Sequence, residues 1–368
     1  MAFLLEHTRR VVVKLGTGIL TSGIGELHQE RIYAICGEIA ALHRKGVEVV
    51  VVSSGAIALG MGQLGLKRRP SDLASLQTCA AIGQARLIQT WQAGFEPENL
   101  AVAQVLFTRD DLKSRNRHVA ALQMLESVVS KGVIPVVNEN DSISTEEIQF
   151  GDNDVLSALV ASLVKADQLI ILSKAPGLVN LRGDGKLIPV VTEYTAEILD
   201  MAEDTADPTG RGGMVTKLEA AQIANKSGCG VFIGSGEDPQ ILNQLFAGDP
   251  EGTFFVPNRL PMASKKRWIA FFQKPLGHIQ VDDGACRALL ENGKSLLAKG
   301  ILNLEGEFSP ESVVEILDAS RRPIARGITH YGSDNLAQVK GKSNDAIQAE
   351  FPDQKRLEVV HRDEMVLL

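Results

Sequence analysis

The chain has 368 residues, of which 44% are hydrophobic and 23% charged, with 38 Lys and Arg against 45 Asp and Glu. This length exceeds that of a typical single domain, and the apolar runs are too short to cross a membrane, so we expect two domains and no membrane-spanning segment. The formal net charge of -7 argues against a general nucleic-acid-binding surface, because binding to phosphates needs an excess of Lys and Arg.

Apolar, β-branched runs alternate with long segments of helical periodicity over the first two thirds of the chain. A run that is apolar throughout predicts a strand buried on both faces, as in a parallel sheet covered by helices. Gly46 and Gly228 follow the helical segments 29–45 and 213–227 and predict their C-termini. The predicted class is therefore α/β, with a mostly parallel open sheet covered by helices on both faces. The predicted strands are 11–13, 47–52, 101–107, 133–137, 169–172 and 231–233.

The character of the sequence changes after Gly248. Turn-forming residues are frequent over 249–261, and the later part of the chain has short apolar segments broken by Gly, Pro and Asp. Such a pattern predicts a small, mainly-β barrel. We predict a large N-terminal domain over residues 1–262, a linker over 263–276 and a small mainly-β domain over 277–368.

The N-terminus and the cysteines indicate the cellular compartment. Residues 1–7 lack the basic, apolar and small-residue layout of a secretory signal, so we expect a cytoplasmic protein. The cysteines have no paired spacing, which predicts reduced thiols rather than a zinc site or a disulfide framework. They are Cys36, Cys79, Cys229 and Cys286.

The segments that follow the predicted strands are rich in Gly and small polar residues. In an open α/β sheet, ligands bind beyond the carboxyl ends of the strands. Each segment alone is weak evidence, because Gly and Ser are common turn formers. Together they predict one concave polar edge that backbone amides line. The segments are 14–18, 53–56, 138–141, 173–177 and 234–236.

Charged and amide side chains concentrate at two of these places. Asn138-Glu139-Asn140-Asp141 ends an apolar strand and Gly151-Asp152-Asn153-Asp154 follows, which predicts a ligand that carries both charge signs. Lys14 ends another apolar strand, where a lysine is unfavourable unless its charge is used or its side chain extends to solvent. Asp154 begins a helical stretch, so its alternative role is that of a helix-terminus charge.

Two glycine turns lead directly into helical segments. Ser54-Gly55-Ala56 opens a helix whose free N–H groups can face an anion, and the alternative is that Ser54 is only the N-cap. Residues 210–217 form a glycine-rich turn with Lys217 one helical turn in, and the alternative is a flexible loop with a solvated lysine. Lysines and acids gathered at the ends of parallel strands are typical of phosphoryl-transfer sites.

In combination, these motifs resemble the glutamate 5-kinases of the amino-acid kinase family. The resemblance covers nearly the whole chain and implies ATP- and Mg²⁺-dependent phosphorylation of the γ-carboxylate of L-glutamate, the first step of proline synthesis. One departure is that Ser173-Lys174 stands where the family usually has Thr-Asp, which replaces an anion near the nucleotide by a cation. The matching segments are 13–17, 54–58, 137–141, 151–154 and 212–217, and segments 281–285 and 297–301 are similar to the C-terminal PUA domain of the bacterial enzymes.

The resemblance also implies roles for single residues. Lys14 and Lys217 are expected to contact the transferring phosphoryl group, with Asp154 positioning both lysines. The amides of Gly16 and Gly55 are expected to cradle phosphoryl and carboxylate oxygens, and no residue is expected to bind a metal directly. The expected substrate-binding residues are Ser54, Gly55, Asp141 and Asn153. The expected ATP-binding residues are Lys14, Gly16, Ser173, Lys174, Gly212, Gly213, Met214, Thr216 and Lys217.

Regulation and partners follow from the same resemblance. Asp111 and Glu147 match acidic positions of the family's regulatory region, which implies feedback inhibition by proline. The resemblance further implies a homo-oligomer and a transient partner, glutamate-5-semialdehyde dehydrogenase. Two alternatives stay open: another amino-acid kinase with a different acidic substrate, or an RNA-binding PUA protein. Residues 277–368 carry 11 Lys and Arg against 15 Asp and Glu, so the positive surface expected of RNA binding is missing.

Overall fold

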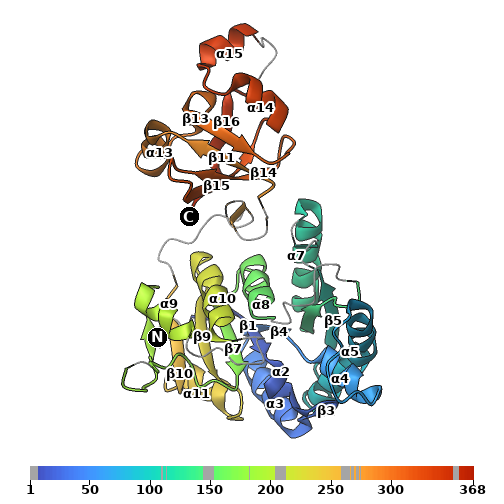
Figure 1. Cartoon of the computed structure of the whole chain (residues 1–368). Helices are drawn as coiled ribbons and strands as arrows, with labels where there is room; N and C mark the ends of the chain where they lie inside the picture. The colour runs from blue at the N-terminus through green and yellow to red at the C-terminus, as the bar shows by residue number, and fades with distance from the viewer. Residues whose placement is uncertain are drawn as a thin grey trace. The chain divides into compact units, whose positions relative to one another are not determined.

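The computed structural model describes residues 7–108, 111–112, 114–143, 153–181, 183–203, 213–257, 266, 269–270, 273, 275–350 and 356–368. The chain divides into two compact units, Met1–Pro261 and Met262–Leu368, and Figure 1 shows the helices and strands of each. Within the described ranges, no helix is both long enough and apolar enough to span a bilayer.

The first unit is built around one large sheet. Its strands are β1 (Arg10–Leu15), β4 (Glu48–Val52), β5 (Val102–Phe107), β6 (Ile134–Glu139), β7 (Gln168–Ser173), β8 (Val190–Val191), β9 (Gly230–Ser235) and β10 (Gly252–Phe255). They form an eight-stranded sheet in the order β5-β6-β4-β1-β7-β9-β10-β8. The strands from β5 to β9 in this order are parallel, β10 is antiparallel to β9, and β8 is parallel to β10. The predicted mostly parallel open sheet is confirmed.

Helices cover both faces of this sheet (Figure 1). One face packs against α3 (Gln29–Arg44), α5 (Leu73–Phe95) and α11 (Ile241–Ala247), with the short α2 (Thr17–Leu20) beside α3. The other face carries α7 (Arg115–Val129), α8 (Asn153–Leu163) and α10 (Met214–Lys226), with α9 (Ala196–Glu203) against α10. Helix α4 (Ala56–Gln63) packs on α5, and β2 (Thr21–Gly23) and β3 (Glu26–Leu27) form a separate hairpin.

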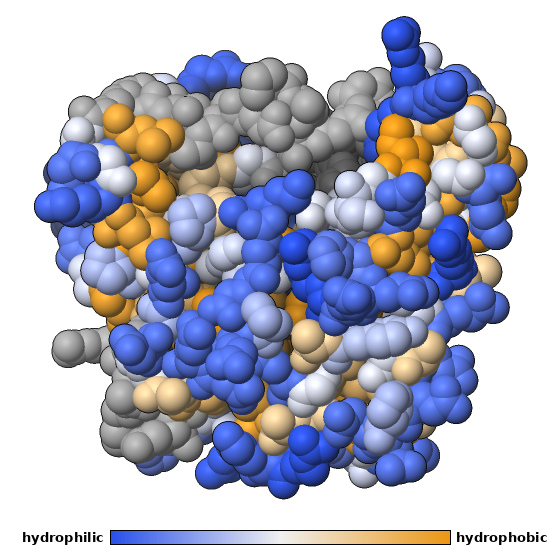
Figure 2. Space-filling view, turned by 90° about the horizontal axis from the view of Figure 1, so that it is seen from below, coloured by the Kyte–Doolittle hydropathy of each residue, from blue (hydrophilic) through white to orange (hydrophobic). Residues whose placement is uncertain are grey.

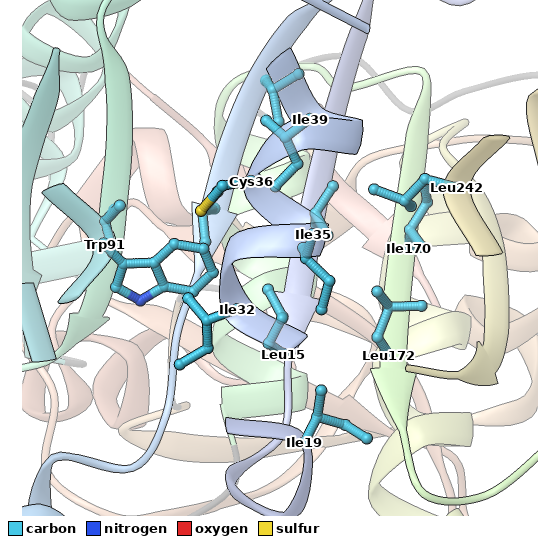
Figure 3. Packing of buried hydrophobic residues seen from close by; sticks show 14 of the residues in the cluster. Leu15, Ile19, Ile32, Ile35, Cys36, Ile39, Trp91, Ile170, Leu172 and Leu242 are labelled. Carbon is cyan, nitrogen blue, oxygen red and sulfur yellow. The ribbon is translucent and has the colours of Figure 1, made fainter. Parts of the chain in front are cut away.

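The central strand β1 shows why its run Val11–Val13 is apolar without alternation. Successive side chains of a strand point to opposite faces, so Val13 and Leu15 enter one core while Lys14 points to the face of α8. Figure 3 shows Leu15 with Ile170 and Leu172 of β7, packed against isoleucines of α3, and Trp91 of α5 beside Cys36. A parallel strand in this position has no solvent-facing side, which is why alternation is absent from the sequence.

The ends of the two predicted helices agree with the structure to within a residue or two. Gly46 follows α3 with a φ of +84°, and Gly228 follows α10 with a φ of +85°. Only glycine adopts this left-handed conformation without steric strain, so both residues terminate their helices.

The second unit has its own sheet and its own core. Its strands are β11 (Gly277–Val281), β12 (Leu296–Leu297), β13 (Ile301–Glu305), β14 (Val313–Leu317), β15 (Pro323–Thr329) and β16 (Glu358–Leu367), and its helices are α13 (Asp283–Leu290), α14 (Ser333–Val339) and α15 (Asn344–Glu350). The sheet order is β12-β16-β15-β14-β11-β13. Every pairing is antiparallel except that of β11 with β14. Ile269 and Ala270, which lie within the predicted linker, are buried against Val313, Ile328 and Val366 of this unit.

The exposed face in Figure 2 is mainly hydrophilic, and the cysteines are unpaired. Figure 2 shows one face of the molecule, on which hydrophilic residues predominate and apolar residues form separate patches. All four cysteines are free thiols, three of them buried and Cys286 partly exposed. The prediction of reduced thiols without a disulfide framework is confirmed.

Candidate active site

Three charged side chains from distant parts of the sequence meet above the centre of the sheet. Lys14 is the penultimate residue of β1, Asp154 is in the first turn of α8, and Lys217 is in the first turn of α10. Strand β1 lies between β4 and β7, and α8 packs against β1 and α10. The fold therefore brings one strand end and two helix starts to a single point.

Asp154 contacts both lysines. Its Oδ1 forms an ion pair with the Lys14 ammonium, and its Oδ2 accepts a hydrogen bond of 3.0 Å from the Lys217 Nζ. Lys14 is 3% exposed, Lys217 5% and Asp154 0%, so neither lysine extends to solvent. Thr216 donates from its hydroxyl to Oδ2 of Asp154 (3.3 Å) and to the carbonyl of Gly213 (2.9 Å). The cluster carries two cations for one carboxylate, which favours an incoming anion.

A second group of polar residues lines a small cavity at the same edge of the sheet. All four expected substrate-binding residues lie on its wall: Ser54, Gly55, Asp141 and Asn153. The cavity volume is about 70 Å³. An adjoining cavity of about 310 Å³ shares Ala56, Glu139 and Asp141 with it.

The amide of Asn153 organises the wall of this cavity. Its Nδ2 donates to the carbonyl of Ser53 (2.5 Å), to the Oγ of Ser54 (3.1 Å) and to Oδ1 of Asn138 (2.7 Å). Ser54 is not the N-cap of α4. Gly55 has that position, with a φ of +100° and no side-chain cap, and the first residues of α4, Ala56 to Ala58, line the cavity.

Asp141 is a titratable group of the substrate cavity with a shifted pKa. Burial raises the pKa of its carboxyl to about 6, and the Arg69 guanidinium opposes this rise. Below that pH the side chain is neutral, and above it a carboxylate is available to an ammonium group.

Sequence reasoning missed several residues of the cavity wall. Asn138 and Glu139 belong to the polar cluster 138–141 and line the cavity. The density of polar groups in this cluster could have predicted them as substrate-binding residues. Arg69 lies in the connection between α4 and α5, after Lys67 and Arg68, and nothing local distinguishes it from a solvated surface cation. Its place beside Asp141 is decided by the fold.

Three of the expected nucleotide-binding residues, Gly16, Gly213 and Met214, lie at the end of β1 and at the start of α10. The N–H of Gly16 donates to the carbonyl of Leu172 (3.0 Å), so this amide continues the pairing of β1 with β7. Gly16 does lie beside Lys14, because a Cβ added to it would be 3.8 Å from the lysine Nζ. Gly213 is the N-cap of α10 without a side-chain cap, and Met214 is buried.

Ser173 and Lys174 end β7 at the same edge. The Ser173 hydroxyl accepts from the N–H of Ala175 (3.2 Å), and its carbonyl accepts from the N–H of Gly236 (2.9 Å). Lys174 is exposed, and its aliphatic stem lies over Gly18, where an added Cβ would be 2.9 Å from its Cε. The cation that replaces the family's usual Asp is therefore close to the loop after β1.

The remaining predicted residues are Gly212, Glu147 and Asp111. Gly212 and Glu147 lie outside the described residues, as does Asp152 of the second polar cluster. The carboxylate of Asp111 accepts from the N–H of Thr108 (2.8 Å) and its hydroxyl (2.6 Å) and pairs with Arg117 (3.0 Å). Asp111 lines neither of the two cavities.

Comparison with known proteins supports the motif-based resemblance. Residues 9–235 match the amino acid kinase family and residues 277–351 match the PUA domain. A glutamate 5-kinase of Dehalococcoides mccartyi (strain ATCC BAA-2266 / KCTC 15142 / 195) is 42% identical over 367 residues, which cover 98% of each chain. Glutamate 5-kinases of Caldanaerobacter subterraneus subsp. tengcongensis and Pelobacter propionicus are 42% and 41% identical, over 98% and 99% of each chain. The chain therefore belongs to the amino acid kinase family, in the group of the glutamate 5-kinases.

Proposed function

We propose that this chain transfers the γ-phosphoryl group of ATP to the γ-carboxylate of L-glutamate, forming γ-glutamyl phosphate and ADP. The observation that carries the proposal is the buried cluster of Lys14, Asp154 and Lys217, in which two cations share one carboxylate, at the same sheet edge as a cavity suited to an amino acid. Sequence identity to glutamate 5-kinases over nearly the full length supports the choice of substrate.

The residues suit a reaction between two anions. A γ-carboxylate is already ionised at neutral pH, so an oxygen of it can attack the γ-phosphorus without a general base. The bond from the γ-phosphorus to the bridging oxygen breaks, and ADP leaves with the electron pair. The lysines counter the negative charge on the transferring group, which is the main catalytic requirement of phosphoryl transfer.

Mg²⁺ belongs to this proposal as the partner of ATP. The described residues contain no group of three or more His, Cys, Asp or Glu side chains placed to hold a metal ion, and both oxygens of Asp154 are engaged by lysines. Mg²⁺ bound mainly by phosphates and water would suit this protein, and it would neutralise charge on the β- and γ-phosphates.

Recognition of the amino acid would use both charge signs of the cavity wall. The Asp141 carboxylate and the amide oxygen of Asn153 suit the α-ammonium group. The guanidinium of Arg69, the Ser54 hydroxyl and the N–H groups at the start of α4 suit the α-carboxylate. Sites that hydrogen-bond a charged substrate discriminate strongly against analogues that lack the group.

A trapping assay tests the proposal. The purified chain is incubated with ATP, Mg²⁺ and hydroxylamine together with L-glutamate, L-aspartate or N-acetyl-L-glutamate, and the hydroxamate is identified by mass spectrometry. We expect γ-glutamyl hydroxamate and ADP only with glutamate. Hydroxamate formed from another acid instead, or ATP consumption that is independent of the amino acid, would contradict the proposed substrate.

The proposed function also includes inhibition by proline and association with other protein chains. Proline carries an α-carboxylate and a cationic nitrogen but no γ-carboxylate, so it can occupy the cavity without offering a nucleophile. We therefore expect proline to raise the apparent KM for glutamate, with Glu147 as a regulatory residue. The product is a reactive acyl phosphate, which favours direct transfer to a glutamate-5-semialdehyde dehydrogenase. We also expect the chain to form a homo-oligomer, as the family resemblance implies.

A further inference from the structure

Helix α5 contributes two buried polar side chains to the region behind the substrate cavity. Gln84 is 9% exposed and Trp91 is 0% exposed. They are seven residues apart, two helical turns, and so they lie on the same face of the helix. The indole of Trp91 is part of the hydrophobic core beside Cys36 (Figure 3), which holds this part of α5 rigidly.

Each of these side chains bonds to a strand end that supports the substrate cavity. Nε1 of Trp91 donates to the Oγ of Ser53 (2.9 Å), directly after β4. Oε1 of Gln84 accepts from Nδ2 of Asn138 (2.8 Å), in the last part of β6. Both bonds are buried and join residues 38 and 54 positions apart in the chain.

Asn153 bonds to both Ser53 and Asn138, the partners of Trp91 and Gln84. Oδ1 of Asn138 accepts from Nδ2 of Asn153 (2.7 Å), and the same Nδ2 donates to the carbonyl of Ser53 (2.5 Å). We call Gln84, Asn138 and Asn153 the amide relay. Asn138 both donates through its nitrogen, to Gln84, and accepts through its oxygen, from Asn153, so the Gln84 oxygen sets the orientation of Asn138, which in turn sets that of Asn153.

The relay has a consequence for the ligand. With its nitrogen held by Asn138 and Ser53, the amide of Asn153 presents Oδ1 on its other side, as an acceptor. A reversed amide would present a donor, which repels an ammonium group. The orientation of this one amide therefore decides whether Asn153 can accept from an amino-acid substrate.

The described contact of the Gln84 amide is made by its oxygen, which accepts from Asn138. Among the residues that the structure describes, no group accepts a hydrogen bond from its buried Nε2. A buried donor without an acceptor costs free energy, so what Gln84 contributes through its amide is the acceptor for the buried Nδ2 of Asn138. Gln84 also does not line the substrate cavity itself, but the adjoining one.

We propose that Gln84 is a positioning residue for glutamate, which acts through Asn138 by fixing the orientation of the Asn153 amide; this inference rests on the proposed function. Gln84 touches no reacting atom. Its loss weakens the binding of the amino acid and leaves ATP binding and the phosphoryl-transfer cluster of Lys14, Asp154 and Lys217 unaffected.

The test compares Gln84→Leu with Gln84→Met, both of which remove the acceptor while filling a similar volume. We expect either variant to raise the glutamate KM about tenfold, with kcat and the ATP KM within twofold of wild type. Calorimetric titration of glutamate in the presence of a non-hydrolysable ATP analogue checks the same change in affinity without turnover. Gln104→Leu is the matched control, because Gln104 lines the same adjoining cavity but is outside the relay.

A double-mutant cycle shows whether the effect passes through Asn153. In an Asn153→Ala background, Gln84→Leu or Gln84→Met should leave kcat/KM for glutamate unchanged. Glutamate KM values like wild type in both Gln84 variants, or an equal tenfold effect with and without Asn153, would overturn the inference. A wild-type chain that forms no γ-glutamyl hydroxamate would instead contradict the proposed function.

Discussion

Asp154 holds two ammonium groups at once, so a neutral side chain in place of either lysine would leave the cluster with a single cation. We predict that Lys14→Ala and Lys217→Ala each lower kcat by a hundredfold or more, since losing one electrostatic contact to a transition state costs ~3 kcal/mol. Hydroxamate formation measures the loss and circular dichroism verifies the fold. Lys226→Ala, at the opposite end of α10, is the control. Activity like wild type in either active-site variant would contradict the assignment.

Asp141 gives the proposed reaction a pH dependence. Its pKa is raised to about 6, mainly by burial, so the carboxyl is protonated below this pH and cannot pair with the α-ammonium group of glutamate. We predict that kcat/KM for glutamate falls about tenfold per pH unit below pH 6, because this ratio reports the pKa of the free enzyme. This fall in kcat/KM below pH 6 should be absent in Asp141→Asn, whose kcat/KM should be low at every pH. If kcat/KM fell in the same way below pH 6 in wild type and in Asp141→Asn, the titrating group would not be Asp141.

At the scale of elements, the crossing of α4 and α5 shapes the substrate cavity. A Cβ added to Gly83 of α5 would lie 1.8 Å from the carbonyl oxygen of Ala56, and one added to Gly60 would lie 1.9 Å from that of Cys79. The two helices therefore touch through their backbones. Ala56 begins α4 and lines both cavities, so the distance between the helices also sets the width of the site.

The crossing leads to a prediction for Gly83→Ala. Overpacking at a backbone contact costs about 1–3 kcal/mol, so the melting temperature should fall by several degrees, and the displaced Ala56 should raise the glutamate KM more than the ATP KM. Gly37→Ala in α3 is the control: its added Cβ meets no atom closer than 3.9 Å, and alanine favours helices. Equal melting temperatures for Gly83→Ala and Gly37→Ala would show that α4 can move away from α5 without loss of stability.

At the scale of the whole molecule, the first unit contains both the sheet and every described site residue. We predict that a chain ending at Pro261 folds and forms γ-glutamyl hydroxamate at a rate within a few-fold of the full chain. A chain ending at Gln273 should be less soluble, because it keeps Ile269 and Ala270 without the core of the second unit that buries them. Circular dichroism and the trapping assay measure both. A chain to Pro261 that is folded but inactive would show that the second unit completes the site.

The sequence by itself determined the class of fold and the position of the site along the chain. Parallel strands covered on both faces are apolar throughout, so the runs that became β1, β4 and β7 could be recognised without a structure. Ligands bind at the carboxyl ends of such strands, so polar residues directly after them were candidates on physical grounds. The shared motifs then indicated the family, which the comparisons confirmed.

Only the tertiary structure decided which of these groups meet and which are already engaged. It placed β1 between β4 and β7, brought Arg69 next to Asp141, and linked Gln84 to Asn153 through Asn138. It also paired the Gly16 amide with the carbonyl of Leu172. The reason is that these hydrogen bonds join residues 15 to 156 positions apart, and such a bond between separate elements leaves no periodicity or local motif in the chain.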